Sequence, residues 1–144
     1  MRDIDAVCAI EEETFSMPWH KESFIEMMNE PNALYLVAVD DKDVICGVAG
    51  LLAVCGEGNV NNIVVRHDYR DRGIGKRLIQ SMMDIGRKEY SIEEFTLEVR
   101  VSNERARGLY EHLGFACEGI RPGFYEKPTE DAAIYWLRKN NGLL

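Results

Sequence analysis

The chain has 144 residues, of which 46% are hydrophobic and 29% are charged, and this balance excludes an intrinsically disordered chain. The length predicts one globular domain over residues 1–144. The formal net charge of −8 argues against a direct nucleic-acid partner, because such proteins gain affinity by neutralising phosphates with basic side chains. No apolar stretch approaches the roughly 18 residues that span a membrane, and no signal peptide is recognisable, so we expect a cytoplasmic protein with no membrane partner.

Cysteine usage predicts neither disulfides nor a zinc site. The four cysteines lie far apart in apolar settings, at Cys8, Cys46, Cys55 and Cys117. They show no C-x-x-C spacing and no neighbouring histidine pair, so we expect reduced cysteines in the core. The three histidines are equally scattered and are predicted to lie at the surface, so we expect no metal.

The N-terminal residues predict two helices. Asp3 is placed to cap the first one, and Pro18 ends it, because a proline disfavours helix at the residue before it. A second short helix follows and ends at Pro31. Trp19 between them has two interpretations. It fills the core between the helices, which composition alone favours, or it lines the rim of a substrate groove.

Three strands follow, in an order that predicts an antiparallel hairpin and one further strand. Their predicted ranges are Leu34–Val39, Val44–Val54 and Val60–Val65, with turns at Asp40–Asp43 and Gly56–Asn59. Gly47 and Gly50 lie inside the second strand and predict a bulge or a close backbone approach there.

The segment Arg70–Gly75 joins the third strand to an amphipathic helix predicted from Ile74 to Lys88. Gly73 and Gly75 let backbone N–H groups turn towards an anion, and the helix start adds the positive end of its dipole. Basic side chains surround the turn at Arg70, Arg72, Lys76 and Arg77. We therefore predict a phosphate-binding turn, although a G-x-G sequence taken alone is more often an ordinary strand-to-helix connection.

A fourth strand, Phe95–Val101, alternates apolar and polar residues and carries Glu98 as its only carboxylate. Ser102 or Asn103 caps the next helix, in which Tyr110 falls at a core spacing. The last two strands are predicted over Phe115–Ile120 and Asp131–Arg138, with Arg121, Phe124 and Tyr125 in the loop between them. This order predicts a mixed α/β domain with one central sheet, in which the strands before and after the central helix run parallel.

Six short motifs occur along the chain in the order of one enzyme family. They are Phe15 with Pro18-Trp19, Arg70–Gly75, Leu97–Asn103, Leu109–Phe115, Arg121 with Phe124-Tyr125, and Asp131-Ala132. They match the patterns F-x-x-P-W, R/Q-x-x-G-x-G/A, L-E-V-R-x-S-N, L-Y-E-x-x-G-F, R-x-x-Y-Y and D-A. The chain thus resembles the GNAT superfamily of acyl-coenzyme A-dependent N-acetyltransferases, and more closely its RimI-type ribosomal-protein alanine N-acetyltransferases. Each motif is weak alone, whereas the ordered set is specific.

The resemblance implies a GNAT fold of the α/β class, a single central mixed sheet flanked by about four helices. Two features depart from the family. Its members usually begin with a strand before the first helix, and this chain starts almost at the helix, so the first strand is missing or supplied otherwise. Phe124 stands in place of the first of two tyrosines, so only Tyr125 keeps a hydroxyl there.

The resemblance also implies acetyl-coenzyme A as co-substrate, with Glu98 as general base through water and Tyr110 as the acid for the leaving thiolate. The residues alone leave other interpretations: a solvent-facing or Arg100-paired Glu98, and a Tyr110 that only packs in the core. The implied coenzyme-binding residues are the backbone groups of Ile63, Val64 and Val65, the side chain of Asn103, and the turn residues Arg70, Asp71, Arg72, Gly73, Ile74, Gly75 and Lys76.

The implied acceptor is a protein N-terminus, with the N-terminal alanine of a small-subunit ribosomal protein as the substrate of the RimI-type enzymes. Pro18 and Trp19 on one side, and Arg121 and Tyr125 on the other, would flank the acceptor groove. An α-amine has a pKa of about 7.7–8.0, so only modest help from a base is needed. Two alternatives stay open: a GNAT enzyme for lysine side chains or small-molecule amines, and a non-catalytic coenzyme-binding domain.

Overall fold

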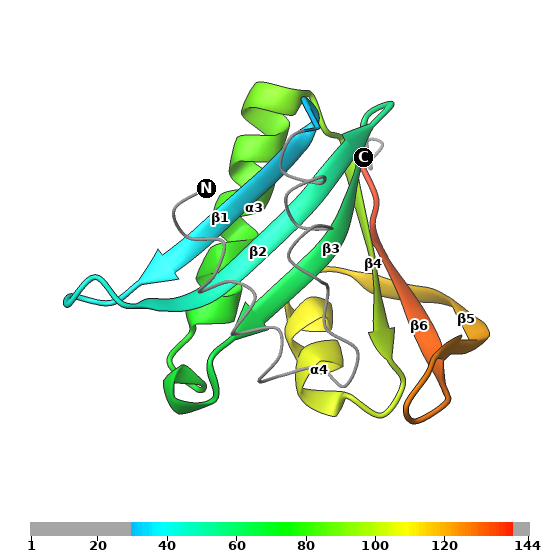
Figure 1. The fold of residues 1–144 in the computed structure, drawn as a ribbon. Coiled ribbons are helices and arrows are strands. Elements are labelled where there is room, and N and C mark those ends of the chain that lie inside the picture. The colour runs from blue at the N-terminus through cyan, green and yellow to red at the C-terminus, as the bar shows by residue number, and fades with distance from the viewer. Residues whose placement is uncertain (1–29, 140–144) are drawn as a thin grey trace.

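The structure of the chain, a computed structural model, describes residues 30–139. Within this range six strands form one mixed sheet in the order β1-β2-β3-β4-β6-β5, accompanied by two α-helices and one 3-10 helix (Figure 1). The elements are β1 (Ala33–Val39), β2 (Ile45–Val54), β3 (Glu57–Val65), η1 (His67–Tyr69), α3 (Ile74–Tyr90), β4 (Glu94–Arg100), α4 (Glu104–His112), β5 (Ala116–Tyr125) and β6 (Glu130–Leu137). The predicted mixed α/β class with a central sheet is confirmed.

Several predictions concern residues before this range. The two N-terminal helices and the first strand of the family lie outside the described residues, as do Pro18 and Trp19. Of the flanking helices expected for the fold, the described range contains α3 and α4. From β1 onwards, the order of strands and helices is the predicted one.

The antiparallel meander of β1, β2 and β3 has a shorter second turn than the sequence predicts. Glu57 pairs with Val54, so Cys55 and Gly56 alone make the turn. Their φ angles are 50° and 80°, and two residues with positive φ give a two-residue turn the twist that matches its flanking strands. The predicted turn over Gly56–Asn59 is therefore wrong, because the polar residues after Gly56 already belong to β3.

The two glycines inside β2 have the roles that their positions predict. A Cβ atom at Gly50 would lie 2.3 Å from the ring of Tyr35, and one at Gly47 would lie 3.0 Å from the side chain of Leu78. The register between β2 and β3 also shifts directly after Gly50, which marks a bulge. Both a close approach and a bulge are thus confirmed in this strand.

The strands β3 and β4 pair in parallel, as predicted, but over a short length. The pairing runs from Glu57 opposite Glu94 to Asn59 opposite Thr96. Beyond these residues the two strands diverge, and β4 pairs with β6 on its other side (Figure 1). The C-terminal halves of β3 and β4 therefore face one another across an opening in the described sheet, without ladder hydrogen bonds between them.

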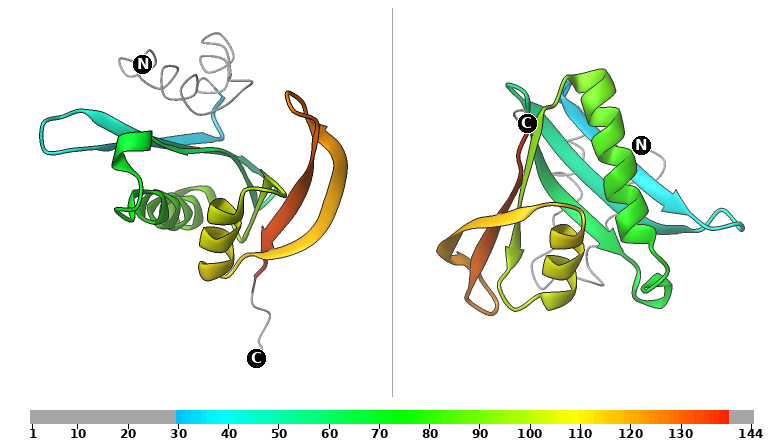
Figure 2. Two further views of the ribbon diagram at one scale, coloured as in Figure 1. Left: turned by 90° about the horizontal axis from the view of Figure 1, so that it is seen from below. Right: turned by 180° about the vertical axis from the view of Figure 1, so that it is seen from behind.

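Both α-helices lie on the same face of the sheet (Figure 2). Helix α3 buries Leu78, Ile79, Met82, Met83 and Gly86 there. The four side chains among them join a core to which β4 contributes Phe95, Leu97 and Val99, and α4 contributes Tyr110. Burial of each large apolar side chain stabilises the fold by about 1.5–3 kcal/mol. Because side chains alternate along a strand, β4 turns Glu98 and Arg100 towards the opposite face.

The final hairpin differs from the prediction of two short strands and a loop. Strand β5 begins at Ala116 and continues to Tyr125, so Arg121, Phe124 and Tyr125 belong to the strand rather than to a loop. Its pairing with β6 is irregular between Arg121 and Tyr125. The backbone N–H of Gly123 donates to the Asp131 carboxylate at 2.9 Å, which keeps this irregular stretch attached to β6.

The prediction of core cysteines holds at one of the three described positions. Cys46 is buried on β2, and its thiol donates to the carbonyl of Ala38 at 3.4 Å. Cys55 and Cys117 are exposed, so a core position is wrong for both. Cys55 lies at the tip of the β2–β3 turn. Cys117 lies on β5, the edge strand, which has a neighbouring strand on one side only. Cys8 lies outside the described residues.

Candidate active site

Glu98 lies on β4, two residues beyond the last parallel pair with β3, and its side chain is exposed. Its neighbours Leu97 and Val99 belong to the core, so Glu98 points away from the helices. Arg100 pairs with Glu130 at 3.3 Å and not with Glu98, so the interpretation of an Arg100-paired Glu98 is wrong. Among residues 30–139, Glu98 makes no ion pair, so its carboxylate is accessible where the two strands diverge.

Tyr110 is a buried residue of the helical layer. It lies on α4 and is only 7% exposed, with its ring centroid 6.0 Å from that of Phe115 and 6.1 Å from that of Tyr135. The core-packing interpretation is therefore correct for the ring. Burial raises the pKa of the Tyr110 hydroxyl well above its ordinary value of 10.0, and the nearby Tyr125 raises it further. The hydroxyl therefore stays protonated at neutral and moderately alkaline pH.

Tyr125 connects these two groups electrostatically. It is half-buried at the end of β5, and burial raises its pKa to about 12, with a second contribution from the negative charge of Glu98. Tyr125 in turn contributes to the raised pKa of Tyr110. Tyr125 is thus within electrostatic reach of a carboxylate on β4 and of a phenol on α4. This cluster combines a candidate base with two proton donors.

The predicted phosphate-binding turn has the backbone geometry that anion binding needs. Gly73 has a φ of 75° and is the N-cap of α3, and Asp71 has a φ of 64°. The first turn of α3 has no side-chain cap and contains no acidic residue, so its N–H groups and dipole are available. Apart from its chain neighbours, no heavy atom lies within 4 Å of the position that a Cβ atom on Gly73 would take, so the turn is open on that side.

The basic side chains of this turn do not all point into that space. Arg70 turns back, with its Nε donating to the carbonyl of Val65 at 3.3 Å. The guanidinium of Arg72 lies 5.1 Å from the ring centroid of Tyr69. Lys76 Nζ lies 3.4 Å from His112 Nε2, which places a positive charge between the start of α3 and the end of α4. Arg70 and Arg72 are thus directed elsewhere, and Lys76 lies against the end of α4.

The other predicted coenzyme-binding residues lie along the opening. Ile63, Val64 and Val65 pair with β2 on one side and lie beyond the last pair with β4 on the other. The backbone groups of these residues that face β4 can therefore form hydrogen bonds with a molecule outside the sheet. Asn103 is the N-cap of α4, with its Oδ1 accepting from the backbone N–H of Ala106 at 3.2 Å. The cap uses the side-chain oxygen and leaves the amide nitrogen for a ligand.

The predicted acceptor-site residues are described only in part. Arg121 is exposed on β5, and its guanidinium lies 5.2 Å from the ring centroid of Phe124. Phe124 in turn packs edge-on against Tyr125, with ring centroids 5.0 Å apart. These three side chains form one wall on the β5 side of Glu98. Pro18 and Trp19, predicted to form the facing wall, lie outside the described residues.

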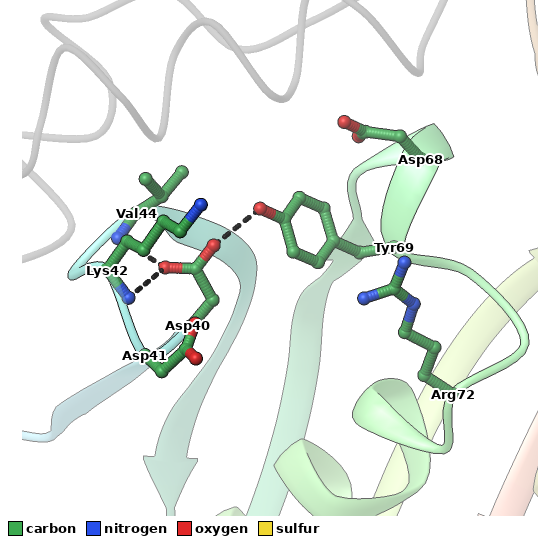
Figure 3. Close-up of a pocket in the computed structure, with 7 residues that line it drawn as sticks. All are labelled: Asp40, Asp41, Lys42, Val44, Asp68, Tyr69 and Arg72. Carbon is green, nitrogen blue, oxygen red and sulfur yellow. Dashed lines mark hydrogen bonds between the residues drawn. The ribbon is translucent and has the colours of Figure 1, made fainter.

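A shallow depression of about 460 Å³ lies beside the phosphate-binding turn (Figure 3). It is lined by Asp40, Asp41, Lys42, Val44, Asp68, Tyr69 and Arg72. The hydroxyl of Tyr69 donates to Asp40 at 2.6 Å, and this hydrogen bond lowers the pKa of the Asp40 carboxyl. The depression therefore marks the place where the β1–β2 turn is tied to the segment before Arg72, and it does not include the Glu98 cluster.

Two groups that support the cluster were not predicted as functional. Arg100 occurs in the L-E-V-R motif, but the sequence does not show that its guanidinium contacts the β5–β6 hairpin. Glu111 occurs in the L-Y-E motif, and its carboxylate accepts a hydrogen bond of 2.6 Å from the buried Tyr135. In the sequence, the only indication that Arg100 and Glu111 support the site is that each lies inside one of these motifs.

Neither a metal site nor a membrane helix is found in the part of the chain that the structure describes. Across residues 30–139, no group of three or more His, Cys, Asp or Glu side chains is placed to hold a metal ion. No helix in that range is both long and apolar enough to cross a membrane.

The chain is similar in sequence to known acetyltransferases. The sequence model of the Acetyltransferase (GNAT) family matches residues 4–115. A Bacillus subtilis relative, assigned provisionally as a ribosomal protein bS18-alanine N-acetyltransferase, is 38% identical over 141 residues, covering 97% of this chain and 92% of the relative.

Solved structures give the same assignment. The crystal structure of the ribosomal-protein-S18-alanine N-acetyltransferase from Escherichia coli has a TM-score of 0.87 at 30% identity, covering 95% of this chain and 88% of that one. Arabidopsis thaliana NAA60 in complex with acetyl-CoA shares the fold, with a TM-score of 0.85 at 20% identity, covering 95% and 94%. The chain therefore belongs to the GNAT family and is an acetyl-CoA-dependent N-acetyltransferase that resembles the RimI-type ribosomal-protein alanine N-acetyltransferases.

Proposed function

We propose that this N-acetyltransferase acts in the cytoplasm on the α-amine of a protein N-terminus, namely the N-terminal alanine of the small-subunit ribosomal protein bS18. The observation that carries the proposal is the accessible carboxylate of Glu98 where β3 and β4 diverge, within electrostatic reach of Tyr125, which in turn influences Tyr110. The relatives from Bacillus subtilis and Escherichia coli, which bear this activity in their names, support the substrate.

Acetyl-CoA fits the described residues as co-substrate. Its pyrophosphate would be held by the backbone N–H groups from Asp71 to Lys76, where the open space over Gly73 admits an anion. Its pantetheine amides would pair with the edge of β3 at Ile63–Val65, and Asn103 would donate to that arm from the start of α4. When bound in this way, acetyl-CoA supplies the acetyl group and a thiolate leaving group.

Glu98 would remove the proton that the acceptor ammonium must lose, directly or through one water molecule. The neutral amine then forms the new C–N bond to the acetyl carbonyl as the C–S bond breaks, so no enzyme nucleophile is required. Backbone N–H groups at the free edge of β3 would stabilise the negative charge that develops on the carbonyl oxygen.

Tyr110 would donate its hydroxyl proton towards the leaving sulfur. Because burial raises its pKa, the hydroxyl is a weak acid, and hydrogen bonding to the developing thiolate contributes more than complete proton transfer. Tyr125 and Arg121, on the β5 side of Glu98, would contact the peptide near its N-terminus, opposite Pro18 and Trp19.

A thiol-release assay with purified ribosomal protein bS18 tests this function. The α-amine assignment predicts coenzyme release with bS18 that begins with a free alanine. It predicts no release with the same protein carrying a chemically blocked N-terminus, although all its lysines remain free. Equal release from both forms would mean that lysine side chains are the acceptors.

A further inference from the structure

Arg100 bonds the strand of Glu98 to the β5–β6 hairpin. Its Nη1 donates to the carbonyl of Pro128 at 2.9 Å and to the carboxylate of Glu130 at 3.3 Å. Its Nη2 donates to the carbonyl of Glu126 at 3.0 Å. One guanidinium on β4 thus holds three acceptors at the tip of the hairpin, two of which are backbone carbonyls.

The same guanidinium lies over the ring of Tyr125. The distance from Arg100 Cζ to the ring centroid is 4.5 Å, which is a close cation–π contact. The side chains of Arg100 and Glu130 are only 24% and 17% exposed, so their ion pair is partly shielded from water. Arg100 and Glu98 lie two residues apart and therefore on the same face of β4. Tyr125 is held to that face beside the carboxylate.

Further hydrogen bonds attach the hairpin to the end of β4. The second oxygen of Glu130 accepts from the backbone N–H of Ser102 at 2.7 Å. The backbone N–H of Val101 donates to the carbonyl of Asp131 at 3.2 Å. The hairpin that carries Tyr125 is therefore bonded to the strand of Glu98 at several points. Arg100 makes most of the side-chain hydrogen bonds at these points.

We infer that Arg100 is a positioning residue that fixes the β5–β6 hairpin, and with it Tyr125, relative to Glu98. The inference rests on the proposed function, in which these two residues face the acceptor peptide. Arg100 itself contacts no reacting atom, because its described donors are directed to the hairpin. Its effect is therefore on the width and shape of the acceptor groove rather than on the chemistry of acetyl transfer.

A lysine cannot reproduce these contacts. A guanidinium is planar and presents several donors in a fixed fork, so it reaches two carbonyls and a carboxylate while stacking on a ring. The Arg100→Lys variant keeps the positive charge near Glu130. It loses the several guanidinium hydrogen bonds and the stacking on the ring of Tyr125. This variant therefore changes geometry while leaving the charge of the site unchanged.

Steady-state kinetics with Arg100→Lys tests the inference. A misplaced groove wall should raise KM for a peptide acceptor by roughly 10- to 100-fold, because displacements on the order of 1 Å have effects of that size. KM for acetyl-CoA should stay unchanged, since the proposed phosphate-binding turn lies at the start of α3. Glu130→Gln, which weakens one of the Arg100 contacts and keeps both carbonyl bonds, should give a smaller rise.

Arg138→Lys is the matched control. Arg138 also bridges strands, with bonds of 2.7 Å to Glu118 and 3.4 Å to Glu94, and it stacks over Trp136 at 3.8 Å from the ring centroid. It lies at the other end of β4 and β6, away from Glu98. Its variant should lose stability as Arg100→Lys does and keep the wild-type KM for peptide. A KM for peptide that rises equally in both variants would overturn the inference.

Hydrogen–deuterium exchange measured without substrates separates this inference from the proposed function. Arg100→Lys should speed exchange of the backbone amides in residues 123–130, and Arg138→Lys should not. Unchanged exchange in that segment would overturn the positioning role, whatever the substrate. If the wild-type protein acetylates no peptide α-amine, the proposed function is wrong, and faster exchange of the segment would still support Arg100 as the residue that fixes the hairpin.

Discussion

The hydroxyl of Tyr135 donates to the carboxylate of Glu111 at 2.6 Å and accepts from the guanidinium of Arg107 at 2.9 Å. Tyr135 is fully buried on β6, and Glu111 and Arg107 lie on α4. Arg107 also donates to the carbonyl of Val101 at 2.9 Å, at the end of β4. These bonds fix α4 on the sheet and thereby set the position of Tyr110.

Tyr135→Phe should lower the free energy of unfolding by about 1–3 kcal/mol, because two hydrogen bonds to charged groups are lost. Chemical denaturation measures this change. Tyr90→Phe is a suitable control, since the Tyr90 hydroxyl makes one longer bond of 3.3 Å to the carbonyl of Ala33. Equal losses in the two variants would contradict a specific role of Tyr135 in holding α4.

Gly73→Ala should abolish the stabilisation of the protein by acetyl-CoA while leaving the fold. A Cβ atom at Gly73 meets no protein atom within 4 Å, so its steric effect falls on the ligand. A ligand at 100 times its Kd should otherwise stabilise the native state by about 2.7 kcal/mol. Thermal unfolding with and without acetyl-CoA measures the shift.

Gly56→Ala is the control for backbone strain at Gly73. Gly56 has a φ of 80°, close to the 75° of Gly73, so alanine should cost each position about 1–2 kcal/mol of stability. Gly56 lies at the β2–β3 turn, and its variant should keep the full shift with acetyl-CoA. A full shift in Gly73→Ala as well would exclude the turn as the phosphate site.

Glu98→Gln should lower kcat by roughly 10²–10⁴ if the carboxylate is the general base. The loss should shrink as the pH rises through the amine pKa of about 8, because free amine then becomes abundant. Glu94→Gln, on the same strand and outside the cluster, should keep wild-type turnover. Wild-type kcat in Glu98→Gln at neutral pH would assign the base role elsewhere.

Tyr110→Phe should also lower kcat, and high pH should not restore it. Burial raises the pKa of Tyr110 above its ordinary value of 10.0, so the protonated donor persists well into the alkaline range. The wild-type rate should therefore rise with pH and reach a plateau, without an alkaline decline from Tyr110. A decline that begins below pH 9 and disappears in Tyr110→Phe would contradict the buried, protonated phenol.

The acid side of the stability profile should depend on Glu130. Hydrogen bonds from Ser102, and then from Arg100, lower the pKa of Glu130 below its ordinary value of 4.5. The folded state then binds fewer protons than the unfolded state, so this stabilisation is present above pH 4.5 and lost as the pH falls through the lowered pKa. The melting temperature should fall less steeply with acid in Glu130→Gln. An unchanged slope would contradict the prediction.

The sequence predicts well those features that depend on local pattern. The alternation along β4 gives the direction of Glu98, and Gly73 directly before Ile74 gives a left-handed residue at a helix start. The parallel pairing of β3 and β4 follows from the helix between them. Each of these depends on residues close together in the chain.

Features set by contacts between distant residues are not visible in the sequence. The path of β5 through Tyr125 depends on the bond between Gly123 and Asp131. The direction of the Arg70 side chain depends on the carbonyl of Val65. This carbonyl accepts a hydrogen bond from Arg70 Nε, which turns the side chain away from the proposed phosphate site. The hydrogen bonds of the Arg100 guanidinium depend on acceptors at the hairpin tip, 26 to 30 residues further along the chain. Sequence patterns carry no information on such partners.

The proposed acceptor is an N-terminal α-amine. It can be tested by mass spectrometry of one peptide that begins with free alanine and contains an internal lysine, after incubation with acetyl-CoA and the full chain. The cluster of Glu98, Tyr110 and Tyr125 is expected to yield a single acetyl group on the alanine nitrogen. An acetyl group on the lysine, or acetylation only of an added polyamine, would contradict an α-amine acceptor.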